Sequence, residues 1–98
     1  MTLPEFLAST QGDAAPPVGS AKVLHALWHS RRNEWDRAHE IAQEIDTPDG
    51  AWVHAHLHRV EGDESNAGYW YARAGKPHST KPLADEWLEI AEAFLTRK

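Results

Sequence analysis

The chain has 98 residues, of which 41% are hydrophobic and 26% are charged, and its formal net charge is −5. This size and composition are those of one small globular domain covering residues 1–98. The acidic balance and the scattered basic residues argue against a nucleic-acid partner, which needs a basic face. The absence of cysteine excludes disulfides and thiolate metal sites. No apolar run approaches the roughly 18 residues of a membrane span, so we expect a cytoplasmic protein with no membrane partner.

Residues 1–20 are expected to form an N-terminal lead. Its first part, 3–8, predicts one short helical turn, and the Gly and Pro residues that follow predict an irregular connector. Ser20 is then expected to cap the first full helix, which runs to about Arg32. Asn33 suits the left-handed conformation that ends many helices.

A second helix is predicted for residues 34–45. Thr47, as a cap, and Pro48, in the first turn, predict the start of a third helix that runs to about Val60. Apolar residues recur in these helices at spacings of three and four, which places them on one face toward a core.

The fourth helix has a stop or start signal at each end. Gly62 is expected to end the preceding helix in the left-handed conformation, Asp63 to cap the fourth helix, and Gly75 to end it. After a loop, a fifth helix is predicted for 82–97, with an apolar stripe of Leu83, Trp87, Ile90, Ala91 and Phe94. No segment alternates with period two, so the predicted fold class is all-α.

An internal repeat links the first four full helices. When the chain is shifted by 29 residues against itself, the first two helices align with the third and fourth. Identical or similar residues then coincide, among them His25 with His54, Ala26 with Ala55, His29 with His58 and Ala38 with Ala67. Two copies of one helix–turn–helix unit within 21–75 are the simplest explanation.

The repeat resembles a known family. The Gly62-Asp63 turn and the helix that follows, with its A-x-x-W-Y-x-x-A core from Ala67 to Ala74, resemble the Sel1-like variety of the tetratricopeptide (TPR) family. The resemblance covers 21–75 and implies two stacked helical hairpins, over which helix 82–97 would act as a C-terminal cap. It also implies a non-enzymatic interaction module that binds a protein or peptide partner, or a second copy of itself as a homodimer. The sequence contains no catalytic constellation and calls for no cofactor.

The paired histidines suggest an alternative function. His25 and His29 are four residues apart, as are His54 and His58, so each pair shares a helix face. If the two hairpins stack, all four imidazoles converge into a site for a transition metal such as zinc, used for binding or for catalysis. The alternative interpretation is that these residues replace core aromatics and form hydrogen bonds within the protein.

One further group of residues suggests a binding surface. Asn66, Tyr69 and Arg73 lie at spacings of three and four beside Trp70 on the fourth helix. An amide, a phenol and a guanidinium next to an indole are groups that hold a carboxylate or a peptide backbone. The alternative is an ordinary solvated face on which Tyr69 packs against the stem of Arg73.

Overall fold

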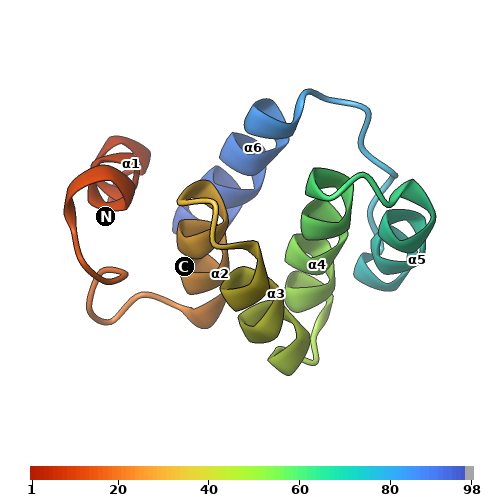
Figure 1. The fold of residues 1–98 in the computed structure, drawn as a ribbon, viewed down its shortest axis with the longest axis horizontal. Helices are drawn as coiled ribbons and strands as arrows, with labels where there is room; N and C mark the ends of the chain where they lie inside the picture. Colours follow the sequence, from red (N-terminus) through yellow and green to blue (C-terminus); the bar gives the residue numbers. More distant parts are fainter. Residues whose placement is uncertain (97–98) are drawn as a thin grey trace.

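The computed structural model describes residues 1–96, and this part of the chain forms six α-helices and no strand (Figure 1). The all-α expectation is therefore confirmed. Residue 97, the expected end of the last helix, lies outside the described residues. The helices are α1 (Leu3–Gly12), α2 (Lys22–Arg31), α3 (Trp35–Glu44), α4 (Pro48–Val60), α5 (Glu64–Ala74) and α6 (Leu83–Leu95).

The helices pack around α4. It contacts α5 and α3 on either side and also touches α2 and α6. Helix α2 packs against α3, and α6 returns across the molecule to contact α2. Figure 1 shows α1 at one end of the molecule and α5 at the other, and α1 reaches the rest of the fold through α2 and α6. Helix α4 is therefore the central element, and nine consecutive residues of it, 50–58, are buried.

The helix ends follow the local signals read from the sequence. Thr47 accepts a hydrogen bond from the backbone N–H of Gly50, and Asp63 accepts one from that of Asn66. Asn33 has φ 62°, the left-handed conformation expected of it. Gly62 and Gly75 also adopt positive φ, at 83° and 70°. These predictions of helix caps and stops are confirmed.

Three local predictions were wrong. The N-terminal turn is a ten-residue helix, and its capping box joins Thr2 and Glu5. Ser20 does not cap α2, because its hydroxyl donates to the carbonyl of Pro17, and Ala21 takes the cap position without a side-chain hydrogen bond. Leu83 is partly exposed at 38% and does not belong to the buried stripe of α6, in which Glu86 is buried instead.

Indole N–H groups tie the helices together across the core. Trp28 donates to the hydroxyl of Ser9 and so joins α2 to α1. Trp87 donates to the carbonyl of Leu27, 2.8 Å away, and joins α6 to α2. Trp35 donates to the carbonyl of Leu57, 2.7 Å away, and joins α3 to α4. A buried indole needs such a partner, and these three bonds set how the helices sit on one another.

Candidate metal site and its surroundings

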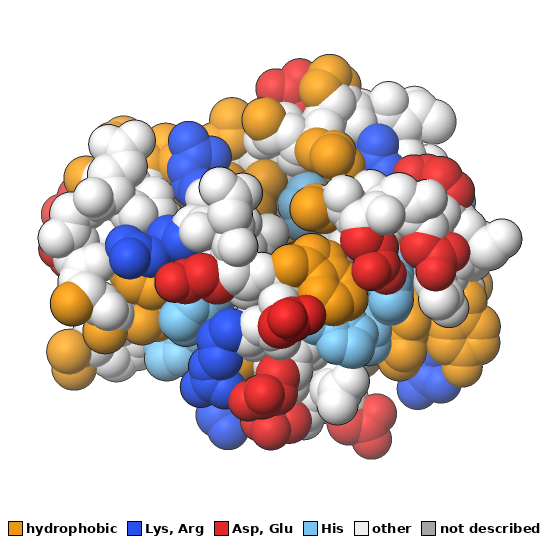
Figure 2. All heavy atoms as spheres, in the orientation of Figure 1, with side chains coloured by type: hydrophobic (Ala, Val, Ile, Leu, Met, Phe, Trp, Pro, Cys, Tyr) orange, Lys and Arg blue, Asp and Glu red, His pale blue; other side chains and the backbone are white. Residues whose placement is uncertain are grey.

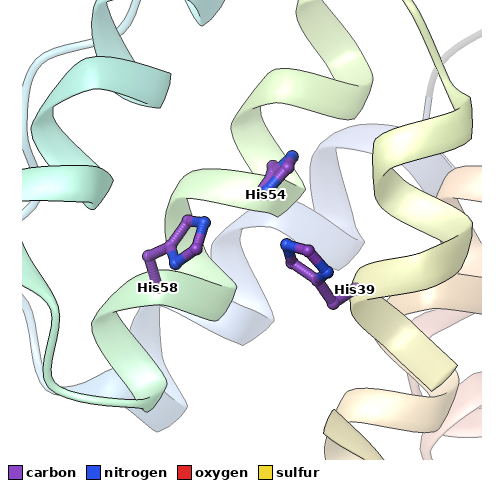
Figure 3. Close-up of side chains that lie close together, drawn as sticks. All are labelled: His39, His54 and His58. Carbon is purple, nitrogen blue, oxygen red and sulfur yellow. The ribbon is translucent and has the colours of Figure 1, made fainter. Parts of the chain in front are cut away.

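Three histidine side chains meet where α3 packs on α4. His39 comes from α3, and His54 and His58 come from successive turns of α4 (Figure 3). Their ring centroids are 4.5 Å apart for His39 and His54, 5.4 Å for His39 and His58, and 4.9 Å for His54 and His58. One nitrogen of each ring lies within 4.8 Å of the others. The three rings therefore converge on one small volume.

Aromatic neighbours hold two of the rings. His39 stacks on Trp35, one helical turn earlier, at a centroid distance of 4.7 Å. His54 stacks on Trp70 of α5 at 3.8 Å, with an angle of 12° between the ring planes. Because Trp35 is itself bonded to the backbone of α4, the position of His39 depends on the contact between the two helices.

A carboxylate orients the third ring. Nδ1 of His58 donates a hydrogen bond to the carboxylate of Glu61 over 2.6 Å. Such bonds to a carboxylate are typically about 2.7 Å long. A carboxylate only accepts, so this bond assigns the ring hydrogen to Nδ1 and leaves Nε2 of His58 as a lone-pair donor. A carboxylate on the far nitrogen is the usual arrangement behind a metal-binding histidine.

The electrostatic environment keeps two of the rings neutral. Burial, and after it the neighbouring His39 and His58, lower the pKa of His54 to about 4. Burial also lowers the pKa of His39, with a second contribution from His58. Both rings therefore have lone pairs at neutral pH, and neither makes a hydrogen bond among the described residues. An imidazole must be in this form to bind a metal ion.

The three nitrogens fit a transition metal after a small adjustment. Zinc binds imidazole nitrogen at about 2.0–2.1 Å in a tetrahedral arrangement, which requires ligand nitrogens about 3.3 Å apart. The nitrogens here lie within 4.8 Å of one another, so they would have to move closer together to hold the ion. Figure 2 shows histidine atoms at the surface next to hydrophobic atoms. His39 is only half-buried, so one ring of the site is within reach of solvent.

The predicted set of four histidines needs correction. His54 and His58 do face a common partner, but that partner is His39 of α3, and neither His25 nor His29 joins the cluster. Nδ1 of His29 donates to the carboxylate of Glu34, 2.7 Å away, and its ring packs against Trp28. The physical reason is that α4 turns this histidine face toward α3, so α2 does not supply ligands.

The predicted polar flank of α5 is mainly engaged within its own helix. The side-chain amide of Asn66 donates to Asp63 as part of the cap of α5. Arg73 donates to the hydroxyl of Tyr69, 3.1 Å away, and lies over the rings of Tyr69 and Trp70. The packing of Tyr69 on Arg73 agrees with the alternative of an ordinary solvated face, whereas Trp70 and Arg73 also line a cleft next to the histidines.

A second polar cluster, which the sequence did not predict, lies on the other side of α4. The carboxylate of Glu86 is fully buried and accepts hydrogen bonds from Nδ1 of His56, from Arg59 and from the hydroxyl of Tyr71. Burial alone would raise the pKa of Glu86, but the bonds from His56, Tyr71 and Arg59 outweigh it and hold the pKa below its usual value. Burial and the bond to Glu86 raise the pKa of Tyr71. The spacing in the sequence could have indicated that Glu86 is buried, since it lies three residues after Leu83 and four before Ile90, on the face of the apolar stripe.

Comparisons with known proteins found no relative of this chain. No protein-family model matches the chain, and no curated protein sequence or solved structure matches it. Among the described residues, no helix has both the length and the apolar character needed to cross a bilayer. The functional argument therefore depends on the geometry of the sites.

Proposed function

We propose that the protein binds a divalent transition metal, with Zn²⁺ as the best fit, through His39, His54 and His58. The observation that carries the proposal is the convergence of three imidazole nitrogens to within 4.8 Å of one another at the contact of α3 and α4. Glu61 would be the carboxylate that fixes the tautomer of His58.

The donor set favours zinc, copper or nickel over magnesium or calcium. Imidazole nitrogen suits the former, whereas the latter take oxygen ligands. Three protein ligands would leave a fourth position of a tetrahedral ion for water or a small ligand, as in zinc sites whose outer ligand exchanges. A bound metal would also link α3 to α4, so it would stabilise the folded state by the binding free energy.

Metal binding is best measured on protein without a polyhistidine tag. Isothermal titration with ZnCl₂ is expected to give one site per chain, and MgCl₂ is expected to give none. His39→Ala should lower the Zn²⁺ affinity by at least about tenfold, because one of three ligands is lost. His29→Ala is the matched control: it removes a histidine of the predicted four-histidine set that lies outside the cluster, and it should leave the affinity unchanged.

The titration separates the three-histidine site from other arrangements. Circular dichroism of each variant first establishes that it is folded. Equal Zn²⁺ affinity in His39→Ala and the unaltered protein would contradict the proposal. An equal loss in His29→Ala would instead favour a site that includes the histidines of α2.

A second proposal concerns the arrangement of the helices and a role in binding a partner. We propose that α2–α3 and α4–α5 form two stacked TPR- or Sel1-like hairpins capped by α6, and that they serve as an interaction module. The supporting observation is that each of these helix pairs packs together and that α3 also packs on α4, the order of contacts in a helical repeat. The partner would be a protein or peptide, or a second copy of the chain. Light scattering across a range of protein concentrations tests self-association, and a constant monomer mass would contradict the homodimer.

A further inference from the structure

Helix α1 is joined to the rest of the fold at the edge of the molecule. Among the helices of the described chain, it contacts only α2 and α6. The connector that follows it, residues 14–21, contains no buried residue, and its Val18 is fully exposed. In Figure 1 this connector loops out beside the helices. The position of α1 is therefore set by its contacts with α2 and α6, and the connector acts as a tether.

The face of α2 and α6 beneath α1 has the features of a site that binds a helix. Phe6 of α1 is fully buried, and its ring stacks on that of Trp87 of α6 with the centroids 5.8 Å apart. Three residues further along α1, the hydroxyl of Ser9 accepts a hydrogen bond from the indole of Trp28 of α2, 3.2 Å away. Anchors three or four residues apart on one face are the usual means by which a groove recognises an amphipathic helix.

Arg32 binds the C-terminal end of α1 through the backbone. Its guanidinium donates to the carbonyls of Thr10, at 3.2 Å, and Asp13, at 3.0 Å. The last carbonyls of a helix have no partner within it and carry the negative end of its dipole, so a cation there is favourable. None of these contacts involves the connector. The α1 of another copy would present the same side chains and carbonyls, so it would fit the same face.

The connector contains one tight turn. Both the N–H and the hydroxyl of Ser20 donate to the carbonyl of Pro17. Gly19, within this turn, has φ 82°, a left-handed conformation that disfavours other residues. Pro16 and Pro17 each keep the residue before them out of the helical region, so opening this single turn would straighten the connector. Its eight residues would then span up to about 28 Å, against 25 Å for the shortest dimension of the molecule.

We infer that α1 also docks on the α2–α6 face of a second copy, so that the chain self-associates by exchanging α1. This inference rests on the self-association in the second proposal, and it names the interface. The exchanged dimer keeps every contact of α1 and needs no new surface, which makes such an exchange a low-cost route to a dimer. Because a short tether gives α1 an effective concentration of about 1 mM at its own face, exchange should compete with the monomer near that protein concentration.

Refolding at two concentrations tests the exchange. Tag-free protein is unfolded in urea and refolded at about 1 mM and at about 10 μM, on either side of the range in which exchange begins to compete. Size-exclusion chromatography with light scattering then measures the mass. A dimer is expected at the higher concentration, and only monomer at the lower one.

An isotope-filtered NOE experiment locates the contact within the dimer. Equal amounts of ¹³C-labelled and unlabelled chains are refolded together at the higher concentration. The dimer should show an NOE between Phe6 of one copy and Trp87 of the other, because these rings stack when α1 is docked. The monomer gives no such signal, since its contact lies within one chain.

Gly19→Ala tests the turn as the hinge. Alanine disfavours the left-handed turn of the monomer but not a straightened connector, and two connectors open for each dimer, so the association constant should rise at least about tenfold. Gly12→Ala is the matched control. An added Cβ meets nothing within 4 Å at either position, but only Gly19 has a left-handed φ, so Gly12→Ala should leave the association constant unchanged.

The possible results separate the exchange from self-association itself. A constant monomer mass at both concentrations would overturn the inference together with the homodimer of the second proposal. A dimer without the NOE between Phe6 and Trp87 would overturn the exchange alone and leave the homodimer to another surface. Equal effects of Gly12→Ala and Gly19→Ala on the association constant would overturn the assignment of the hinge.

Discussion

Glu86→Gln tests how far the fold depends on one buried carboxylate. In the unaltered protein the carboxylate of Glu86 accepts from His56, Arg59 and Tyr71, which come from α4 and α5. The guanidinium of Arg59 is also largely buried, and it lies 2.9 Å from Glu86. Glutamine keeps the size of the side chain but removes the negative charge, so Arg59 loses its buried counter-ion.

The expected cost follows from the two partners that Arg59 keeps. Breaking a buried ion pair by removing one member costs about 3–5 kcal/mol. Arg59 retains a hydrogen bond to the carbonyl of Lys81 and a carboxylate of Glu64 at 3.8 Å, which lowers the expected cost to about 2–4 kcal/mol. For a domain of this size, 1 kcal/mol corresponds to about 4–8 °C in Tm, so the variant should melt at least about 8 °C lower.

The loss of stability in Glu86→Gln should also depend on pH. The pKa of Glu86 in the folded protein is below its usual value of 4.5, so the native state favours the charged form. The stability that this charge contributes is fully present above pH about 4.5 and is lost as the pH falls through the lower, folded-state pKa. The difference in free energy of unfolding between the unaltered protein and Glu86→Gln should therefore be constant near neutrality and shrink below pH 4.5.

Urea denaturation at pH 7 and at several values below 4.5 measures both quantities. Glu89→Gln is the matched control on the same helix, because the ion pair of Glu89 with Lys81 is exposed and should contribute less than about 1 kcal/mol. A loss below 1 kcal/mol in Glu86→Gln at pH 7, or a difference that does not change with pH, would refute the account of a charged carboxylate held by three donors.

Four further substitutions test the backbone and a helix cap by thermal melting. Gly50→Ala should destabilise the protein by about 1–3 kcal/mol, because the added Cβ would come within 2.2 Å of the carbonyl oxygen of Ile45. Gly68→Ala should be neutral or stabilising by up to about 1 kcal/mol, because its Cβ would meet only His78, at 3.4 Å. Equal effects of the two substitutions on Tm would contradict this reasoning. Asn33→Gly should raise Tm or leave it unchanged, because φ is 62° at this position, and a marked loss would show that the side chain matters more than the backbone. Asp63→Ala should cost about 0.5–2 kcal/mol by removing the bond that caps the N–H of Asn66 in α5, and an unchanged Tm would contradict this role.

The helices could be predicted from the sequence because their signals are local. Thr47 with Pro48, Asp63, and the left-handed Asn33, Gly62 and Gly75 each act within a few residues, and the structure has them as predicted. The N-terminal helix was predicted as one short turn, and its greater length was not expected because it depends on distant partners. Phe6 is fully buried and stacks on Trp87, and a contact between residues so far apart in the sequence cannot be predicted from a local pattern.

Gly68 shows the same limit at a single position. Gly68 lies inside α5, where a glycine typically permits the close approach of another helix. The nearest atoms to an added Cβ belong instead to His78 of the loop after α5, at an ordinary contact distance of 3.4 Å. The loop is held by contacts such as the hydrogen bond between Nε2 of His78 and the carboxylate of Glu64, 2.7 Å apart. Helical spacing in the sequence does not predict such contacts.

The histidine site shows why spacing identifies half of a site. The four-residue spacing of His54 and His58 is a property of one helix, so it was visible in the sequence. Which third ring completes the cluster depends on how α3 lies on α4, and that is set by the bond from Trp35 to the carbonyl of Leu57. The internal repeat pointed to His25 and His29 because it compares equivalent positions, whereas His39 has no histidine counterpart in the second unit, where Gly68 stands 29 residues later. A site formed between non-equivalent helices breaks the symmetry of the repeat, so it could be found only once the helices were packed.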